Sequence, residues 1–193
     1  MFKVLIAAIV GGLIFFGWNS FSWSVLPWHQ QTVKHFDNEQ LVAETLKANI
    51  PETGIYVIPK MNFDSDDNNK TVSDTEKSKK QEPFGFLSYR TKGIERSMEE
   101  TTKLALGMSV LASIFIVILL SCTSELSYMA RVLFVVMAGM IGALLGHVPN
   151  WIWWGFDTNY TIVMIADTLI GWFLASLVIA AFVGKESEYE IND

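Results

Sequence analysis

The sequence is poor in the residues that build disulfides, metal centres and nucleic-acid surfaces. Cys122 is the only cysteine among 193 residues, so an intrachain disulfide and a cysteine-based zinc or iron–sulfur site are excluded. The 14 Lys and Arg residues stand against 20 Asp and Glu, a net charge of −6, and the basic residues form no cluster. This balance argues against a nucleic-acid partner and against a polybasic lipid-binding surface.

Motifs that would name a reaction are also missing. The three histidines, His29, His35 and His147, include no close ligand pair, so no metal site is predicted and no cofactor can be named. No Ser-His-Asp spacing, glycine-rich phosphate loop or paired carboxylate stands out. The sequence therefore identifies no catalytic residue and leaves open whether the protein is an enzyme.

What the sequence does contain is long apolar runs. Four of them have about the 18 residues that a helix needs to cross the hydrocarbon core of a membrane. They cover Val4–Leu26, Ala105–Cys122, Val132–Val148 and Thr161–Val183. The first resembles a signal peptide, but its apolar character continues to Leu26, so it is interpreted as an uncleaved anchor. The predicted fold class is a membrane protein, mainly α, with four transmembrane helices.

The polar remainder predicts how the chain is divided. Residues 1–29 form the first transmembrane helix, 30–103 an extracytoplasmic insertion, 104–184 the other three helices, and 185–193 an acidic cytoplasmic tail. Lys3, Arg131 and Lys185 fall on one side of a four-span arrangement, whereas the aromatic loop Val148–Asn159 on the other side has no Lys or Arg. This asymmetry predicts that both termini are cytoplasmic.

The insertion is expected to be a small α/β unit. A capping residue, Asp37 or Asn38, precedes a helix predicted over Glu39–Ala48. Two short strands, Gly54–Pro59 and Phe84–Tyr89, are predicted to pair in an antiparallel ribbon. Residues 62–82 between them are almost wholly polar and cannot bury enough apolar surface to offset their ordering entropy, so a mobile loop is predicted there.

One segment carries a resemblance to known proteins. The run Phe16-Gly17-Trp18, the run Ser22–His29, Phe36, and the stretch Leu46–Asn49 resemble a group of small, uncharacterised bacterial inner-membrane proteins. The resemblance covers roughly the first 60 residues. It implies a bacterial origin and an inner-membrane location, and it implies no activity, cofactor or substrate.

The most unusual residue is Asp167, roughly two turns or about 10 Å inside the fourth apolar run. An acid at this depth costs about 2.5–3.5 kcal/mol unless it is paired or hydrated. On the predicted topology His147 is its nearest titratable neighbour along the chain, and Asn19 and Thr168 belong to the same half of the membrane. Such a cluster could relay protons or hold a cation, or it could be a hydrogen-bond clamp between helices or between subunits.

A second candidate site is aromatic. Six tryptophans and one histidine collect near the outer interface: Trp18, Trp23, Trp28, His29, Trp151, Trp153 and Trp154. They could bind a quinone or a lipid head group, with a histidine as the hydrogen-bonding residue. Anchoring at the membrane interface is the alternative explanation for the same residues.

All four apolar runs also carry small residues at four-residue spacing, for example Ala7 with Gly11, Ala8 with Gly12, and Gly142 with Gly146. This pattern allows close helix packing, within the chain or against another membrane subunit or a second copy. The function predicted from the sequence is an accessory or scaffolding subunit of a membrane assembly. The alternatives are a transporter or channel subunit that uses Asp167 and His147, and a membrane enzyme or quinone- or lipid-binding protein that uses the aromatic site.

Overall fold

Four long helices make up most of the protein. The computed structural model describes residues 2–59, 83–123 and 125–183, so the predicted mobile loop 62–82 and the tail 185–193 lie outside the described residues. The long helices are α1 (Phe2–Val25), α5 (Met98–Ser121), α6 (Tyr128–Trp154) and α7 (Thr158–Phe182). Each is long and apolar enough to cross a membrane. The mainly helical class with four such helices is therefore confirmed.

The short elements lie between the first two long helices. They are α2 (Trp28–Thr32), α3 (Glu39–Asn49), β1 (Gly54–Ile58) and β2 (Gly85–Tyr89). Asn38 caps α3 by accepting a hydrogen bond from the backbone N–H of Leu41 at 2.9 Å. The two strands pair antiparallel, with Tyr56 opposite Leu87. The predicted helix and ribbon are both present, whereas α2 was not predicted.

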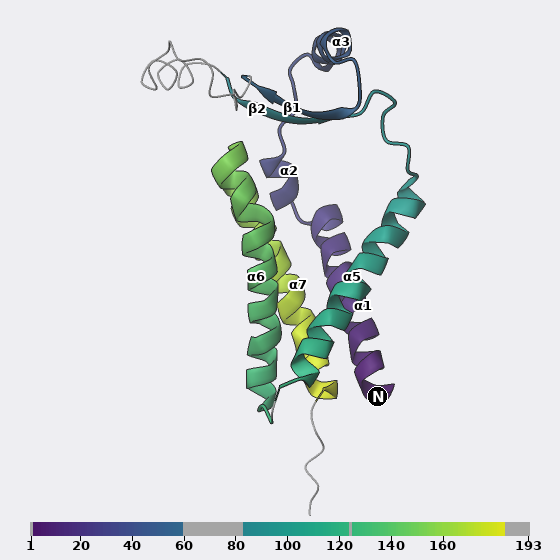
Figure 1. The fold of residues 1–193 in the computed structure, drawn as a ribbon, viewed down its shortest axis with the longest axis vertical. Helices are drawn as coiled ribbons and strands as arrows, with labels where there is room; N and C mark the ends of the chain where they lie inside the picture. The colour runs from purple at the N-terminus through teal and green to yellow at the C-terminus, as the bar shows by residue number, and fades with distance from the viewer. Residues whose placement is uncertain (1, 60–82, 124, 184–193) are drawn as a thin grey trace, which may run out of the picture.

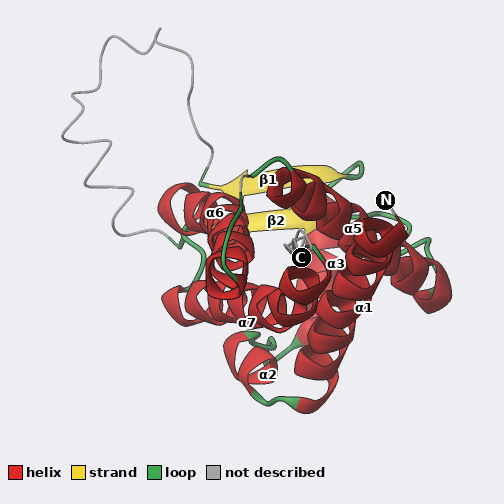
Figure 2. Cartoon of the chain, turned by 90° about the horizontal axis from the view of Figure 1, so that it is seen from below, coloured by secondary structure: helices red, strands yellow, loops and turns green. Residues whose placement is uncertain are grey.

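The long helices form an open row. α7 packs along both α6 and α1, and α1 packs along α5, whereas α5 and α6 have little contact. Figure 1 shows α5 meeting α6 near the lower end and inclining away from it towards the two-stranded sheet. Seen along the helices in Figure 2, the sheet lies on the side where α5 and α6 diverge. Each outer helix of the row therefore has one long neighbour.

The apolar core sits at the end of the row that holds the N-terminus of α1. Its buried members include Ala8, Val117, Val135 and Ile179, which come from the first halves of α1 and α6 and the second halves of α5 and α7. Glycines allow the helices to approach here. A Cβ at Gly12 would lie 2.5 Å from the Cα of Val110 on α5, which is closer than two carbon atoms can pack.

One prediction is wrong at the end of α6. The residues expected to form the aromatic loop Val148–Asn159 continue the helix to Trp154, with Pro149 inside it. Proline has no backbone N–H and therefore removes one hydrogen bond of the helix. The side-chain amide of Asn150 donates to the backbone carbonyl of Gly146, one residue along, at 3.0 Å. The helix ends at Gly155, whose φ of 63° is a left-handed conformation that glycine adopts at little cost.

The sheet contacts this same end of α6. Phe86 of β2 lies against Trp154, with ring centroids 4.8 Å apart, and against Phe156 at 6.0 Å. The ribbon therefore rests on the end of the helical row opposite the core, as Figure 1 shows. This end also holds α2, which carries part of the candidate site.

Candidate functional site

Asp167 of α7 is buried, with 1% of its surface exposed. The indole Nε1–H of Trp18, on α1, points at both the carboxylate and the backbone carbonyl of Asp167. It lies 2.7 Å from Oδ1 and 3.0 Å from the carbonyl oxygen. The second carboxylate oxygen, Oδ2, lies 3.3 Å from Nε2 of His29. Asp167 thus joins α7 to α1 and to α2 through groups of the same chain.

His29 reaches this position because the chain turns back after α1. Pro27 stands between the end of α1 and the start of α2 and acts as the N-cap residue of the short helix. The turn places the imidazole, 1% exposed, beside the last turns of α1. There the indole of Trp23 stacks on it, with ring centroids 3.9 Å apart and an interplanar angle of 11°. Aromatic packing and burial therefore hold the ring against Asp167.

Ser22 completes the hydrogen-bonded group. Its buried hydroxyl accepts a hydrogen bond from Trp28 Nε1–H at 2.8 Å and lies 3.0 Å from His29 Nε2. We refer to Asp167, His29, Ser22, Trp18 and Trp28 as the Asp–His cluster. Its members come from α1, α2 and α7, so the cluster connects three helices through polar contacts in an otherwise apolar environment.

Gly171, one helical turn after Asp167, makes room for the contact with Trp18. A Cβ at this position would lie 2.9 Å from the ring of Phe15 and 3.0 Å from that of Trp18. Both distances are too short for carbon atoms, so a larger residue would push α1 and α7 apart. The place of Gly171 beside the cluster follows from the three-dimensional structure.

The cluster contains the three residue types of a serine hydrolase, but their geometry is different. In a catalytic triad the carboxylate binds Nδ1 of the imidazole and the hydroxyl binds Nε2. Here Ser22 and Asp167 both approach Nε2. Because the carboxylate cannot orient the ring from the other nitrogen, and the hydroxyl is buried, Ser22 is not positioned as a nucleophile.

Within the described part of the chain, the other residues of the predicted polar cluster make no side-chain hydrogen bond with Asp167, and Asn19 and Thr168 make their hydrogen bonds elsewhere. Asn19 donates to the backbone carbonyl of Phe15 at 2.9 Å, within its own helix. Thr168 does the same with the carbonyl of Met164 at 2.9 Å. The side chain of His147, on α6, has no hydrogen-bond partner among the described residues. The histidine that meets Asp167 is therefore His29, which the sequence had grouped with the aromatic residues.

The predicted aromatic site is divided in two. Trp23 and Trp28 pack against His29, and Trp18 packs against Trp28. The other three tryptophans lie at the end of α6, where Trp154 packs on Phe86, Trp151 donates to the hydroxyl of Thr158 at 3.1 Å, and Trp153 is 72% exposed. The first group shares a site with Asp167, and the second supports the sheet and the α6–α7 turn.

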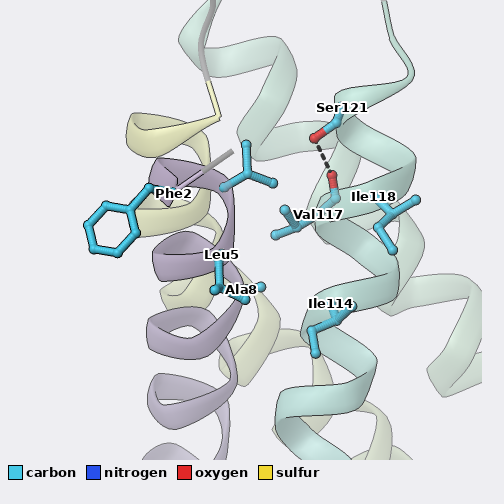
Figure 3. Close-up of a pocket in the computed structure, with 8 residues that line it drawn as sticks. Phe2, Leu5, Ala8, Ile114, Val117, Ile118 and Ser121 are labelled. Carbon is cyan, nitrogen blue, oxygen red and sulfur yellow. Dashed lines mark hydrogen bonds between the residues drawn. The ribbon is translucent and has the colours of Figure 1, made fainter.

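A separate apolar groove lies at the opposite end of the row, between α1 and α5. Its volume is about 660 Å³, and its walls include Leu5, Ala8, Ile114 and Ile118. Figure 3 shows these side chains, together with the one hydroxyl of the groove, Ser121, which donates to the carbonyl of Val117 at 2.7 Å. The groove therefore offers a surface for apolar chains, and its lining includes no titratable side chain.

Comparison with known proteins gives no independent assignment: no family model, no curated protein and no solved structure matches the chain. The class that the fold defines is a chain with four helices able to cross a membrane, a small two-stranded sheet and a buried Asp–His pair.

Proposed function

We propose that this protein is an accessory or scaffolding subunit of a membrane assembly in the bacterial inner membrane. The observation that carries the proposal is the open row of helices, in which α5 and α6 each have one long neighbour. Helices that cross a membrane associate through close packing of small residues. A row that ends in two partly uncovered helices is suited to receive helices of other subunits.

The small residues on α6 support this proposal. Gly139 packs against Trp172 of α7, whereas a Cβ added to Gly142 or Gly146, further along α6, would meet nothing within 4 Å. The first glycine serves packing within the chain. The other two expose a flat surface that a partner helix could approach closely.

The geometry of Asp167 also favours a structural role for the Asp–His cluster over transport. Both carboxylate oxygens are engaged by side chains from α1 and α2, and both Asp167 and His29 are about 1% exposed. A transported ion or proton needs a group that it can reach and leave. The contacts instead fix three helices relative to each other, as a subunit with a defined binding surface requires.

The test is purification from the native membrane with identification of the proteins that co-purify. Replacing both Gly142 and Gly146 by leucine should reduce the recovery of partner proteins at least tenfold, because the branched side chains prevent close approach. The melting temperature of the isolated protein should not fall, since both positions face open space. The matched control is Gly17→Leu, also an exposed glycine with open space around it, on α1. Equal recovery with the double variant and the wild type would contradict the proposal.

The proposed orientation has its own test. Both termini are placed in the cytoplasm and residues 30–103 outside, on the basis of Lys3, Arg131 and Lys185. Reporter fusions at Asn69 and Asp193 should therefore give opposite signals, with only the Asn69 fusion active in an extracytoplasmic reporter. Identical signals from the two positions would exclude a four-span topology.

A further inference from the structure

One polar atom in the Asp–His cluster has no partner. The Nδ1 atom of His29 is buried and makes no hydrogen bond with any described residue, although the ring is about 1% exposed. All the polar contacts of the imidazole go to Nε2, from Ser22 and Asp167. Buried nitrogen atoms of this kind are nearly always paired in proteins.

The positions of the protons on His29 and Asp167 decide whether Nδ1 is a hydrogen-bond donor or an acceptor. A net charge in an apolar environment is strongly unfavourable, so the forms of the His29–Asp167 pair to consider are the two without net charge. In one, Asp167 is ionised and His29 carries a proton on both nitrogens. In the other, Asp167 is protonated and donates from Oδ2 to Nε2, and the neutral imidazole then carries its proton on Nδ1. Both forms place an N–H at Nδ1.

The cluster therefore contains a buried donor that requires an acceptor. Ser22 cannot provide it, because its hydroxyl lies at Nε2, 3.0 Å away. The surroundings of the ring are aromatic: Trp23 stacks on one face, and Trp28 meets it edge-on with centroids 5.8 Å apart. Trp23 is 44% exposed, while the members of the cluster are buried or half-buried. It is thus the exposed one of the two rings that pack on His29.

We propose that His29 Nδ1–H binds the carbonyl oxygen of a lipid-soluble molecule that enters beside Trp23. A membrane offers two sources of such a carbonyl, a quinone ring and the ester group of a phospholipid. In either case the indole of Trp23 moves aside, and the ligand lies between Trp23 and the edge of the imidazole. A flat quinone ring can also stack on the exposed indole. This inference is independent of the scaffolding role.

The first measurement asks whether the donor exists. In detergent-solubilised protein labelled with 15N-histidine, the three histidines give separate signals, and the signal that is lost in His29→Gln belongs to His29. We expect a proton on Nδ1 whose resonance moves downfield when a ligand is added. An Nδ1 atom without a proton, or one whose proton is already hydrogen-bonded in the absence of both ligands, would overturn the proposal.

The second measurement uses the tryptophans as reporters of decylubiquinone binding. Added to protein in phospholipid-free micelles, this quinone should quench the fluorescence with a saturable dependence on its concentration. Trp23→Phe should remove much of the quenching, whereas Trp153→Phe, at the far aromatic group, should not. A parallel titration with phosphatidylglycerol tests whether a phospholipid ester supplies the carbonyl. Here the readout is the position of the Nδ1 proton resonance.

His29→Gln separates ligand binding from the structural role of the residue. The glutamine amide keeps an N–H donor near the position of Nε2, facing Asp167, and has no counterpart of Nδ1. We expect the His29→Gln protein to bind whichever ligand gives a response at least tenfold more weakly than the wild type does. Its melting temperature should stay close to that of the wild type. A response to the quinone alone, or to the phospholipid alone, identifies the source. No saturable response to either, or a response unchanged in a stably folded His29→Gln protein, would overturn the proposal.

Discussion

Asp167→Leu should destabilise the folded protein by about 1–3 kcal/mol, the cost of leaving a buried polar group without its partner. The leucine removes the carboxylate that Trp18 Nε1 and His29 Nε2 both contact, and Trp18 keeps only the backbone carbonyl of residue 167. Since these contacts join α7 to α1 and α2, we expect α2 and the end of α1 to loosen first. The measurement is the melting temperature in detergent, together with the abundance of the variant in the membrane.

Asp167→Asn is the matched control. The amide oxygen can still accept from Trp18 Nε1, and its NH₂ group can donate to His29 Nε2. The clamp should therefore survive with a loss of about 1 kcal/mol, the typical net contribution of one hydrogen bond. Assembly with partner proteins should remain normal in this variant.

The two variants also separate the structural role from transport. If Asp167 moves protons or binds a cation, both substitutions should abolish function while the folded protein accumulates. An Asn variant that assembles normally and yet behaves as a loss of function would contradict the structural interpretation. A Leu variant with wild-type assembly and function would contradict both.

The second large effect is expected at Gly12, where the backbones of α1 and α5 approach each other closely. A Cβ on Gly12 meets the backbone of α5 at Val110, 2.5 Å away, and a backbone atom cannot move aside as a flexible side chain can. Gly12→Ala should therefore destabilise the protein by about 1–3 kcal/mol, the usual cost of overpacking. Gly12→Leu should prevent α5 from docking on α1.

Gly17→Ala provides a control on the same helix. Nothing lies within 4 Å of a Cβ at Gly17, and alanine is a better helix former than glycine by about 0.8–1 kcal/mol. This substitution should leave the stability unchanged or raise it slightly. Opposite signs for two Gly→Ala changes five residues apart would locate the α1–α5 contact, and equal effects would contradict the packing described for Gly12.

The pattern of apolar residues was sufficient to predict the four long helices, because a run of this length without charges has few alternatives to a membrane-crossing helix. The short helix after Asn38 and the two strands also followed from local signals, a capping side chain and two β-prone runs bounded by turn residues. The end of α6 was not predicted correctly from the sequence, because proline usually marks a helix end. There the side chain of Asn150 and the packing of Trp154 on Phe86 support the helix beyond Pro149.

Asp167 was identifiable from the sequence alone, since a single acid in an apolar run is expensive and has to find a partner. The identity of the partner was not, because it depends on where the chain goes after α1. Proximity along the predicted topology pointed to His147, whereas the turn at Pro27 folds His29 back between α1 and α7. Hydrophobic periodicity describes one helix at a time. Only the packing of three helices brings Trp18 and His29 to the same carboxylate. The same packing places Ser22 at Nε2 of His29 and leaves Nδ1 without a partner among the described residues.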